Sequence, residues 1–196
     1  MKSGIKSANL IGINQEHLSP GEFDELRKLG ILDESKKAKE FIFPEFTKGR
    51  KPVARHAVHA AHTLNEAYDY QRPSSFSRAL SLNFADYRVL LVSGTASVDE
   101  HGKTVHTGDF RAQCWRTYRN ITELLKAEDM TWHDVVRTTC YLRDMSRDYR
   151  DFNEIRTYFF GWLGLDVLPA STGIQAILCR EDLLVEIEAI AVTQIK

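Results

Sequence analysis

The stretch that decides the fold is Val185-Glu186-Ile187-Glu188-Ala189-Ile190-Ala191-Val192, near the end of the 196-residue chain. Every second residue from Val185 is apolar, which indicates a strand with one face in a core. Ile190 and Val192, on the other face, are apolar as well. Because a large exposed apolar area marks an interface, we expect both faces of this strand to be covered.

Hydrophobic periodicity upstream of this stretch predicts two helices and five more strands. One helix is capped by Asp109 and runs to Ala127, and the other runs from Tyr149 to Leu163. The remaining strands are expected over residues 77–84, 88–94, 103–106, 135–143 and 171–178. The order β-β-β-α-β-α-β-β predicts an α+β fold, with a six-stranded mixed sheet and both helices on one face.

The chain divides near residue 75, because the pattern before that point is irregular. Ser19-Pro20-Gly21-Glu22 has the residues of a helix start. Residues 53–70 are rich in Ala and contain no Gly or Pro, so they favour a second helix. We therefore expect residues 1–75 to be a partly helical N-terminal extension, and residues 76–196 to be the patterned domain.

Composition excludes several classes of protein. The 26 basic and 27 acidic side chains give a net charge of -1, without the basic excess of a nucleic-acid-binding protein. No stretch approaches the roughly 18 apolar residues of a membrane span, and residues 1–30 lack a signal-peptide core. We therefore expect a cytoplasmic protein without nucleic-acid or membrane partners. Cys114, Cys140 and Cys179 match no zinc or redox spacing and are expected to be free thiols.

His56, His59 and His62 are spaced three residues apart. On a helix the outer two lie about 120° apart, whereas a zinc site needs three or four converging ligands. A polar helix face is the favoured interpretation. No phosphate-binding glycine loop is present either, so we expect neither a metal nor a cofactor.

Five stretches together resemble the YjgF/RidA (Rid) family, also described as endoribonuclease L-PSP. They are residues 90–94 (LLVSG), 134–139 (DVVRTT), 149–153 (YRDFN), 168–170 (LPA) and 185–192 (VEIEAIAV). The resemblance covers about residues 76–193. It implies a chorismate-mutase-like fold and a homotrimer, in which three sheets form a central barrel with ligand clefts between subunits. Such a barrel agrees with the apolar second face of the last strand.

RidA-type members hydrolyse reactive enamines and imines, such as 2-aminoacrylate, to keto acids and ammonia. The resemblance implies that Glu186 handles water in such a reaction. It also implies a substrate-binding set of Phe76, Ser93, Gly94, Asn153, Ser171 and Gly173.

The RidA-type arginine after the Pro-Ala pair is replaced here by Ser171, and the frequent cysteine two residues later is Gly173. A serine cannot form the bidentate pair that an arginine makes with a carboxylate. Arg143 and Arg180 are the candidates to supply a cation from elsewhere in the chain.

Three functions stay open for a site expected to take a small carboxylate-type metabolite. The first is an enamine or imine deaminase that depends on Glu186. The second is a non-catalytic metabolite-binding or regulatory trimer, in which Glu186 and Glu188 are simply solvated or ion-paired. The third is a chorismatase-like enzyme, because residues 169–174 (PASTGI) are similar to a run in chorismatases, which also carry a Rid-like domain. A cation near Ser93 and Ser171 would favour carboxylate chemistry.

Overall fold

The computed structural model describes residues 18–28, 53–70 and 73–195. The chain forms two compact units, Met1–Lys51 and Pro52–Lys196. In the first unit, α1 spans Pro20–Lys28 and begins as predicted, because the Ser19 N–H donates to Glu22 Oε2 at 2.8 Å. None of the helices in the described ranges is long and apolar enough to cross a membrane.

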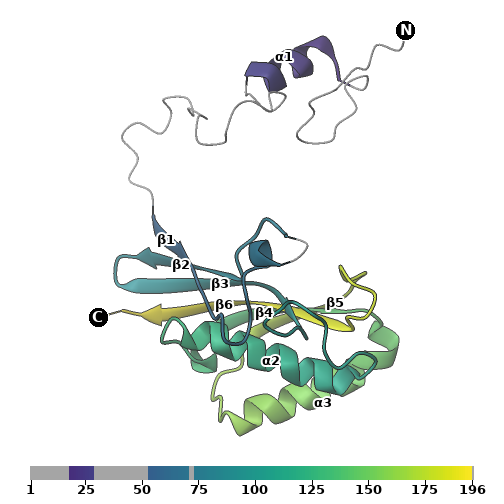
Figure 1. Ribbon diagram of the computed structural model, residues 1–196. Helices are drawn as coiled ribbons and strands as arrows, with labels where there is room; N and C mark the ends of the chain where they lie inside the picture. The colour runs from purple at the N-terminus through teal and green to yellow at the C-terminus, as the bar shows by residue number, and fades with distance from the viewer. Residues whose placement is uncertain (1–17, 29–52, 71–72, 196) are drawn as a thin grey trace. The chain divides into compact units, whose positions relative to one another are not determined.

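The second unit is a six-stranded mixed sheet with two helices against one face (Figure 1). Its spatial order is β1-β2-β3-β6-β4-β5, and only the β4–β5 pair is parallel. The predicted α+β class and the placement of the helices are confirmed. The strands are β1 (Ala54–Ala57), β2 (Ala79–Phe84), β3 (Tyr87–Ala96), β4 (Val135–Leu142), β5 (Ala170–Gln175) and β6 (Val185–Gln194); the helices are α2 (Phe110–Lys126) and α3 (Met145–Trp162).

Two of the predicted elements are wrong. Residues 53–70 form β1 and a 3-10 turn at Ala67–Asp69, not a helix, because pairing with β2 overrides the helix propensity of the alanines. His56 on β1 adds a hydrogen bond of 2.7 Å to the buried Glu128. The predicted strand at residues 103–106 is reduced to a single bridge between Val98 and Thr104. The sixth strand is therefore β1, and the folded unit extends upstream of residue 75.

Both helices begin at aspartates whose side chains accept backbone hydrogen bonds. Asp109 accepts from the Ala112 N–H at 2.9 Å, as predicted for α2. Asp144 accepts from the Arg147 N–H at 3.0 Å, so α3 begins at Met145, one turn before the predicted start.

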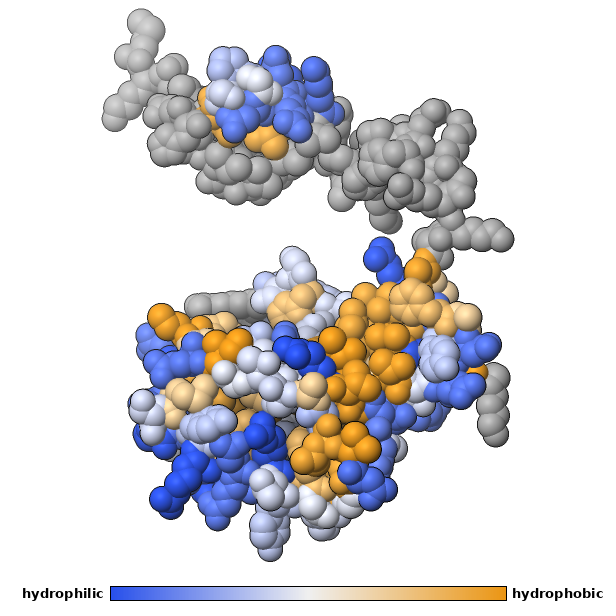
Figure 2. Space-filling view, turned by 180° about the vertical axis from the view of Figure 1, so that it is seen from behind, coloured by the Kyte–Doolittle hydropathy of each residue, from blue (hydrophilic) through white to orange (hydrophobic). Residues whose placement is uncertain are grey.

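The core lies between the helices and the inner face of the sheet. Its β6 residues are Val185, Ile187, Ala189 and Ala191, as the alternation predicted. The outer face of the sheet carries Ile190 and Val192, with Leu91 and Ile174 38% and 41% exposed. Figure 2 shows apolar residues gathered in a band across the folded unit seen from behind. The predicted second apolar face is therefore present, and it is open in a single chain.

Candidate functional site

Glu186 lies on the outer face of the sheet, next to an irregularity in β3. It pairs with Ala96 on β3 and Tyr141 on β4. The register of β3 shifts between Val92 and Thr95, and this irregularity contains Gly94. A Cβ atom built on Gly94 would lie 1.9 Å from Glu186 Oε1. A glycine is therefore required here for the carboxyl group to occupy its position.

Glu186 and Gly94 line a pocket of about 890 Å³ at this end of the sheet. Phe76, another of the predicted residues, forms part of its wall. Arg78, Lys103 and Arg180 also line the pocket, so its cationic side chains outnumber its one carboxylate. Such a balance attracts anionic ligands.

Arg78 is a site residue that the sequence analysis missed. Its side chain is almost buried, and its guanidinium lies 4.9 Å from the ring centre of Tyr70 and 5.2 Å from that of Phe76. Its Nε donates to the carbonyl oxygen of Asn65 at 3.1 Å. The one sign in the sequence that Arg78 belongs to the site was its position two residues after Phe76, immediately before β2. These contacts hold a positive charge rigidly in the wall of the pocket.

The two arginines suggested as replacements have different roles. Arg180 lines the pocket, and its Nη1 donates to the Gly102 carbonyl oxygen. Arg143 donates from Nε to the Leu183 carbonyl oxygen at 2.6 Å and from Nη2 to the Arg180 carbonyl oxygen. Arg143 thus holds the backbone of the segment that presents Arg180.

The pKa of Glu186 is raised above its ordinary value of 4.5, chiefly because the carboxyl group is buried. Arg78 and Arg180 act in the opposite direction, and Glu188 adds to the increase. The effect of burial on the pKa is larger than the opposite effect of the two arginines, so Glu186 keeps its proton to a higher pH than an exposed glutamate. A carboxyl group with a raised pKa is better suited to donate a proton than an exposed glutamate.

Ser93 lies beside this pocket, but its donors are already used. Its N–H donates to the Arg78 carbonyl oxygen at 3.0 Å, and its hydroxyl donates to the Ser77 carbonyl oxygen at 2.8 Å. Ser93 therefore positions the segment that carries Arg78, and both of its hydrogen-bond donors are used within the chain.

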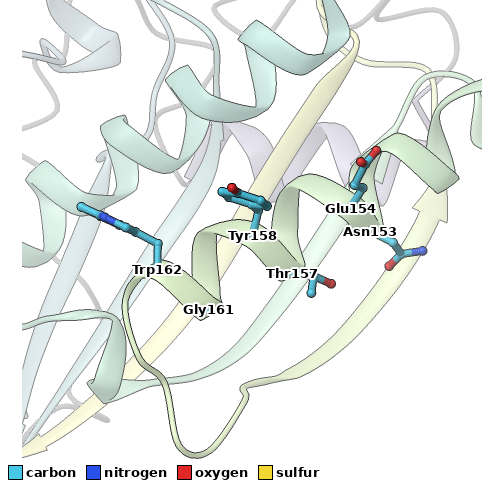
Figure 3. Close-up of a pocket in the computed structure, with 6 residues that line it drawn as sticks. All are labelled: Asn153, Glu154, Thr157, Tyr158, Gly161 and Trp162. Atoms are coloured by element: carbon cyan, nitrogen blue, oxygen red, sulfur yellow. The ribbon is translucent and has the colours of Figure 1, made fainter.

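Asn153, Ser171 and Gly173 form a separate group between α3 and β5. Ser171 and Gly173 pair with Thr138 and Cys140, whereas Glu186 pairs with Tyr141. Because successive strand residues point to opposite faces, Ser171 and Gly173 lie on the helix side of the sheet, away from Glu186. Asn153 projects from α3 on the same side as Thr157 (Figure 3). In one chain the predicted residues therefore do not form a single cleft.

The histidines on and after β1 contact different carboxylates. His56 Nε2 lies 2.7 Å from Glu128 Oε1, and His59 Nδ1 lies 3.5 Å from Glu66 Oε1. Within residues 18–28, 53–70 and 73–195, no group of three or more His, Cys, Asp or Glu side chains is placed to hold a metal. The cysteines are free thiols, as predicted.

Comparisons with known proteins agree with this fold. The family model for endoribonuclease L-PSP matches residues 71–193. The chain is 35% identical over 106 residues to the mouse 2-iminobutanoate/2-iminopropanoate deaminase, covering 54% of this chain and 74% of that protein. It is also 35% identical over 141 residues to the chorismatase of Streptomyces rapamycinicus, covering 68% of this chain but 41% of that enzyme. The crystal structure of the YjgF gene product of E. coli superposes with a TM-score of 0.57 and 21% identity, covering 71% of this chain and 99% of that one. Because the family model matches more than half of its length, the chain belongs to the endoribonuclease L-PSP family, which is the YjgF/RidA family.

Proposed function

We propose that the chain is a hydrolase that adds water to a small, carboxylate-bearing enamine or imine in the Glu186 pocket. The observation that carries this proposal is a half-buried carboxyl group with a raised pKa in a pocket lined by three cationic side chains. The cations Arg78 and Arg180 hold the substrate carboxylate, and Phe76 packs against its body. Gly94 leaves the space that the Glu186 carboxyl group occupies.

The proposed reaction uses Glu186 twice. Its carboxyl group donates a proton to the terminal carbon of the enamine, which becomes an iminium ion. Water then adds to the iminium carbon and returns a proton to the Glu186 carboxylate. The carbinolamine loses ammonia and leaves the keto acid. General acid–base catalysis of this kind contributes about 10²- to 10⁴-fold to a rate.

The mouse relative supports this class of substrate, because its name specifies two imino acids. A second candidate is an enol ether such as chorismate, which is protonated at carbon and hydrated in the same way. The match to the chorismatase extends over 141 residues, longer than the 106-residue match to the deaminase. The several cations of the pocket suit a substrate with more than one carboxylate.

The test is the release of ammonia or keto acid from 2-aminoacrylate generated in situ, with chorismate as the second substrate. Glu186→Gln keeps the size of the side chain and removes the proton donor, so we expect the acceleration to be lost. Glu188→Gln is the comparison variant, because Glu188 lies two residues along the same strand and faces the separate pocket beside Arg137. This change lowers the pKa of Glu186 but keeps its carboxyl group, so it should shift the pH dependence of the acceleration without abolishing it. No acceleration by the wild type would leave a non-catalytic binding protein, and equal acceleration by Glu186→Gln would exclude Glu186 as the proton donor.

We also propose that the open face of the sheet is covered in a homotrimer, with ligand clefts at the borders between copies. The support is the apolar surface of Leu91, Ile174, Ile190 and Val192 on that face. A face of this kind is stabilised by burial at roughly 25 cal/mol per Å². The trimer would carry one Glu186 pocket in each copy.

A further inference from the structure

Arg180 reaches the Glu186 pocket from a segment that lies outside the helices and strands. The residues that join β5 to β6, 176–184, have no regular secondary structure. The backbone of such a segment is not fixed by a helix or a sheet ladder, so other contacts must determine where it lies. The position of the Arg180 charge therefore depends on the groups that hold this backbone.

The Arg180 guanidinium has donors left for a ligand. Its Nη1 donates to the Gly102 carbonyl oxygen and, at 3.4 Å, to Thr104 Oγ1. Within the described residues, no carboxylate oxygen lies within 4.0 Å of its nitrogens. A guanidinium presents a planar fork of donors that matches a carboxylate. Arg180 can therefore bind an anion, provided that its backbone is held in place.

Arg143 holds this backbone from the end of β4. It directly follows Leu142, the last residue of that strand, and its own N–H donates to the Leu184 carbonyl oxygen at 2.9 Å. Its side chain adds two bonds, from Nε to the Leu183 carbonyl oxygen at 2.6 Å and from Nη2 to the carbonyl oxygen of Arg180 itself. Hydrogen bonds with a charged donor are stronger than those between neutral groups. Arg143 thus ties both ends of residues 180–184 to the sheet.

Gln113 holds the same segment from α2. Its side chain is fully buried. Its Nε2 donates to the Asp182 carbonyl oxygen at 2.8 Å, and its Oε1 accepts from the Leu184 N–H at 2.8 Å. The same Nε2 donates at 3.2 Å to the carbonyl oxygen of His106, which precedes α2. Residues 180–184 are therefore tied to the helical layer as well as to the sheet.

Arg143 and Gln113 act on the pocket from outside it. Arg180 and Leu183 of the segment line the pocket, whereas the described residues that line it do not include Arg143 or Gln113. The bonds that these two side chains make to the segment all go to its backbone. Any effect that they have on a bound ligand must therefore pass through the position of the segment.

We propose that Arg143 and Gln113 are positioning residues for the carboxylate site of the Glu186 pocket. They hold residues 180–184 so that the Arg180 guanidinium faces the substrate carboxylate, and neither of them touches the substrate. The inference rests on the proposed function, which places the substrate carboxylate at Arg78 and Arg180. It adds that two side chains outside the pocket set its affinity for an anion.

The experiment is a titration of the full-length protein with pyruvate, the keto acid that 2-aminoacrylate yields, followed by NMR so that weak binding is measured too. Arg143→Met keeps the aliphatic part of the side chain and removes its donors. We expect it to weaken binding about tenfold, the effect of losing one hydrogen bond to a charged group. Arg143→Lys keeps a charged donor without the fork and should lose less.

A double-mutant cycle separates positioning from a general structural defect. If Arg143 acts through Arg180, Arg143→Met should weaken binding about tenfold in the wild type but less than about twofold in the Arg180→Met protein. A general defect would give the same loss in both. Arg147→Met is the matched control, because Arg147 lies 2.6 Å from Asp148 on α3 and away from the segment, and it should bind pyruvate like wild type.

Gln113→Glu is the second variant, because it keeps the acceptor for the Leu184 N–H and loses the donor to Asp182. It should weaken pyruvate binding with the same dependence on Arg180, and thermal melting without ligand checks the fold of every variant. The proposal is overturned if pyruvate does not bind, if Arg143→Met and Gln113→Glu both bind it like wild type, or if the loss is equal in the Arg180→Met protein. Hydrolysis is measured separately: Arg180-dependent binding of pyruvate without hydrolysis would exclude the proposed reaction and leave the positioning role standing.

Discussion

Gly94→Ala is the change that tests the Glu186 pocket most directly. The added methyl group would lie 1.9 Å from Glu186 Oε1 and 2.9 Å from Cδ, whereas real contacts of this kind stay beyond 3.0 Å. The carboxyl group must therefore move by about 1 Å, and a misplacement of that size costs about 10²-fold in rate. The obstructed atoms are the far end of a flexible side chain, so we expect a loss of stability below about 2 kcal/mol.

The assay measures ammonia or keto-acid release together with thermal melting. Gly94→Ala should melt within about 6 °C of wild type but lose about 10²-fold in rate. Gly161→Ala on α3 is the matched control, because a Cβ there has no heavy atom within 4 Å. A folded Gly94→Ala protein with the wild-type rate would refute the assignment of the reaction to the Glu186 carboxyl group in this position.

Three further predictions concern stability and assembly. Burial raises the pKa of Glu186 above 4.5, so the folded protein loses stability as pH rises and this carboxyl group ionises, by about 1.4 kcal/mol for each unit by which its folded pKa exceeds its unfolded pKa. Glu186→Gln should therefore melt at a higher temperature than wild type at pH 7. Melting curves without such a pH-dependent difference would contradict the raised pKa. Asn120 is fully buried and its Nδ2 donates to the Ala96 and Val98 carbonyl oxygens, both at 3.0 Å. Each oxygen keeps a second donor, the Val98 N–H or Arg116 Nε, so Asn120→Ala should lower the free energy of unfolding in urea by about 1–3 kcal/mol through its two lost hydrogen bonds, and no measurable loss would contradict their contribution. Light scattering should give a molecular mass three times the 22.4 kDa of one chain. Leu91→Arg should shift the protein towards the monomer, and a monomeric wild type at micromolar concentration would exclude the trimer.

Periodicity predicted the sheet well where a strand packs against the core on at least one face. In β6 the alternation of Val185 and Ile187 with Glu186 and Glu188 alone indicates both the strand and its buried side. The predictions of secondary structure were wrong where long-range contacts determine whether a segment forms a helix or a strand. β1 is composed of Ala54-Arg55-His56-Ala57, a sequence with no strand pattern, and it is a strand because β2 offers it a free edge.

The site shows the same division. Glu186, Gly94 and Phe76 were predicted from the family resemblance, and they do line one pocket. Arg78 was missed, since its importance comes from the side chains beside it, the rings of Tyr70 and Phe76. The spacing of residues in the sequence does not show which side chains are neighbours in the folded protein.

The charges of the Glu186 pocket link ligand binding to the protonation of Glu186. Arg78 and Arg180 lower the pKa of this carboxyl group and partly offset the effect of burial. A carboxylate ligand paired with these arginines neutralises their influence and excludes more water, and both effects raise the pKa further. Binding of the substrate therefore favours the protonated carboxyl group that the proposed first step needs. A neutral ligand in the same place would leave the arginines unopposed and Glu186 more acidic than a carboxylate ligand would, so the proposed reaction would favour carboxylate-bearing enamines over neutral ones.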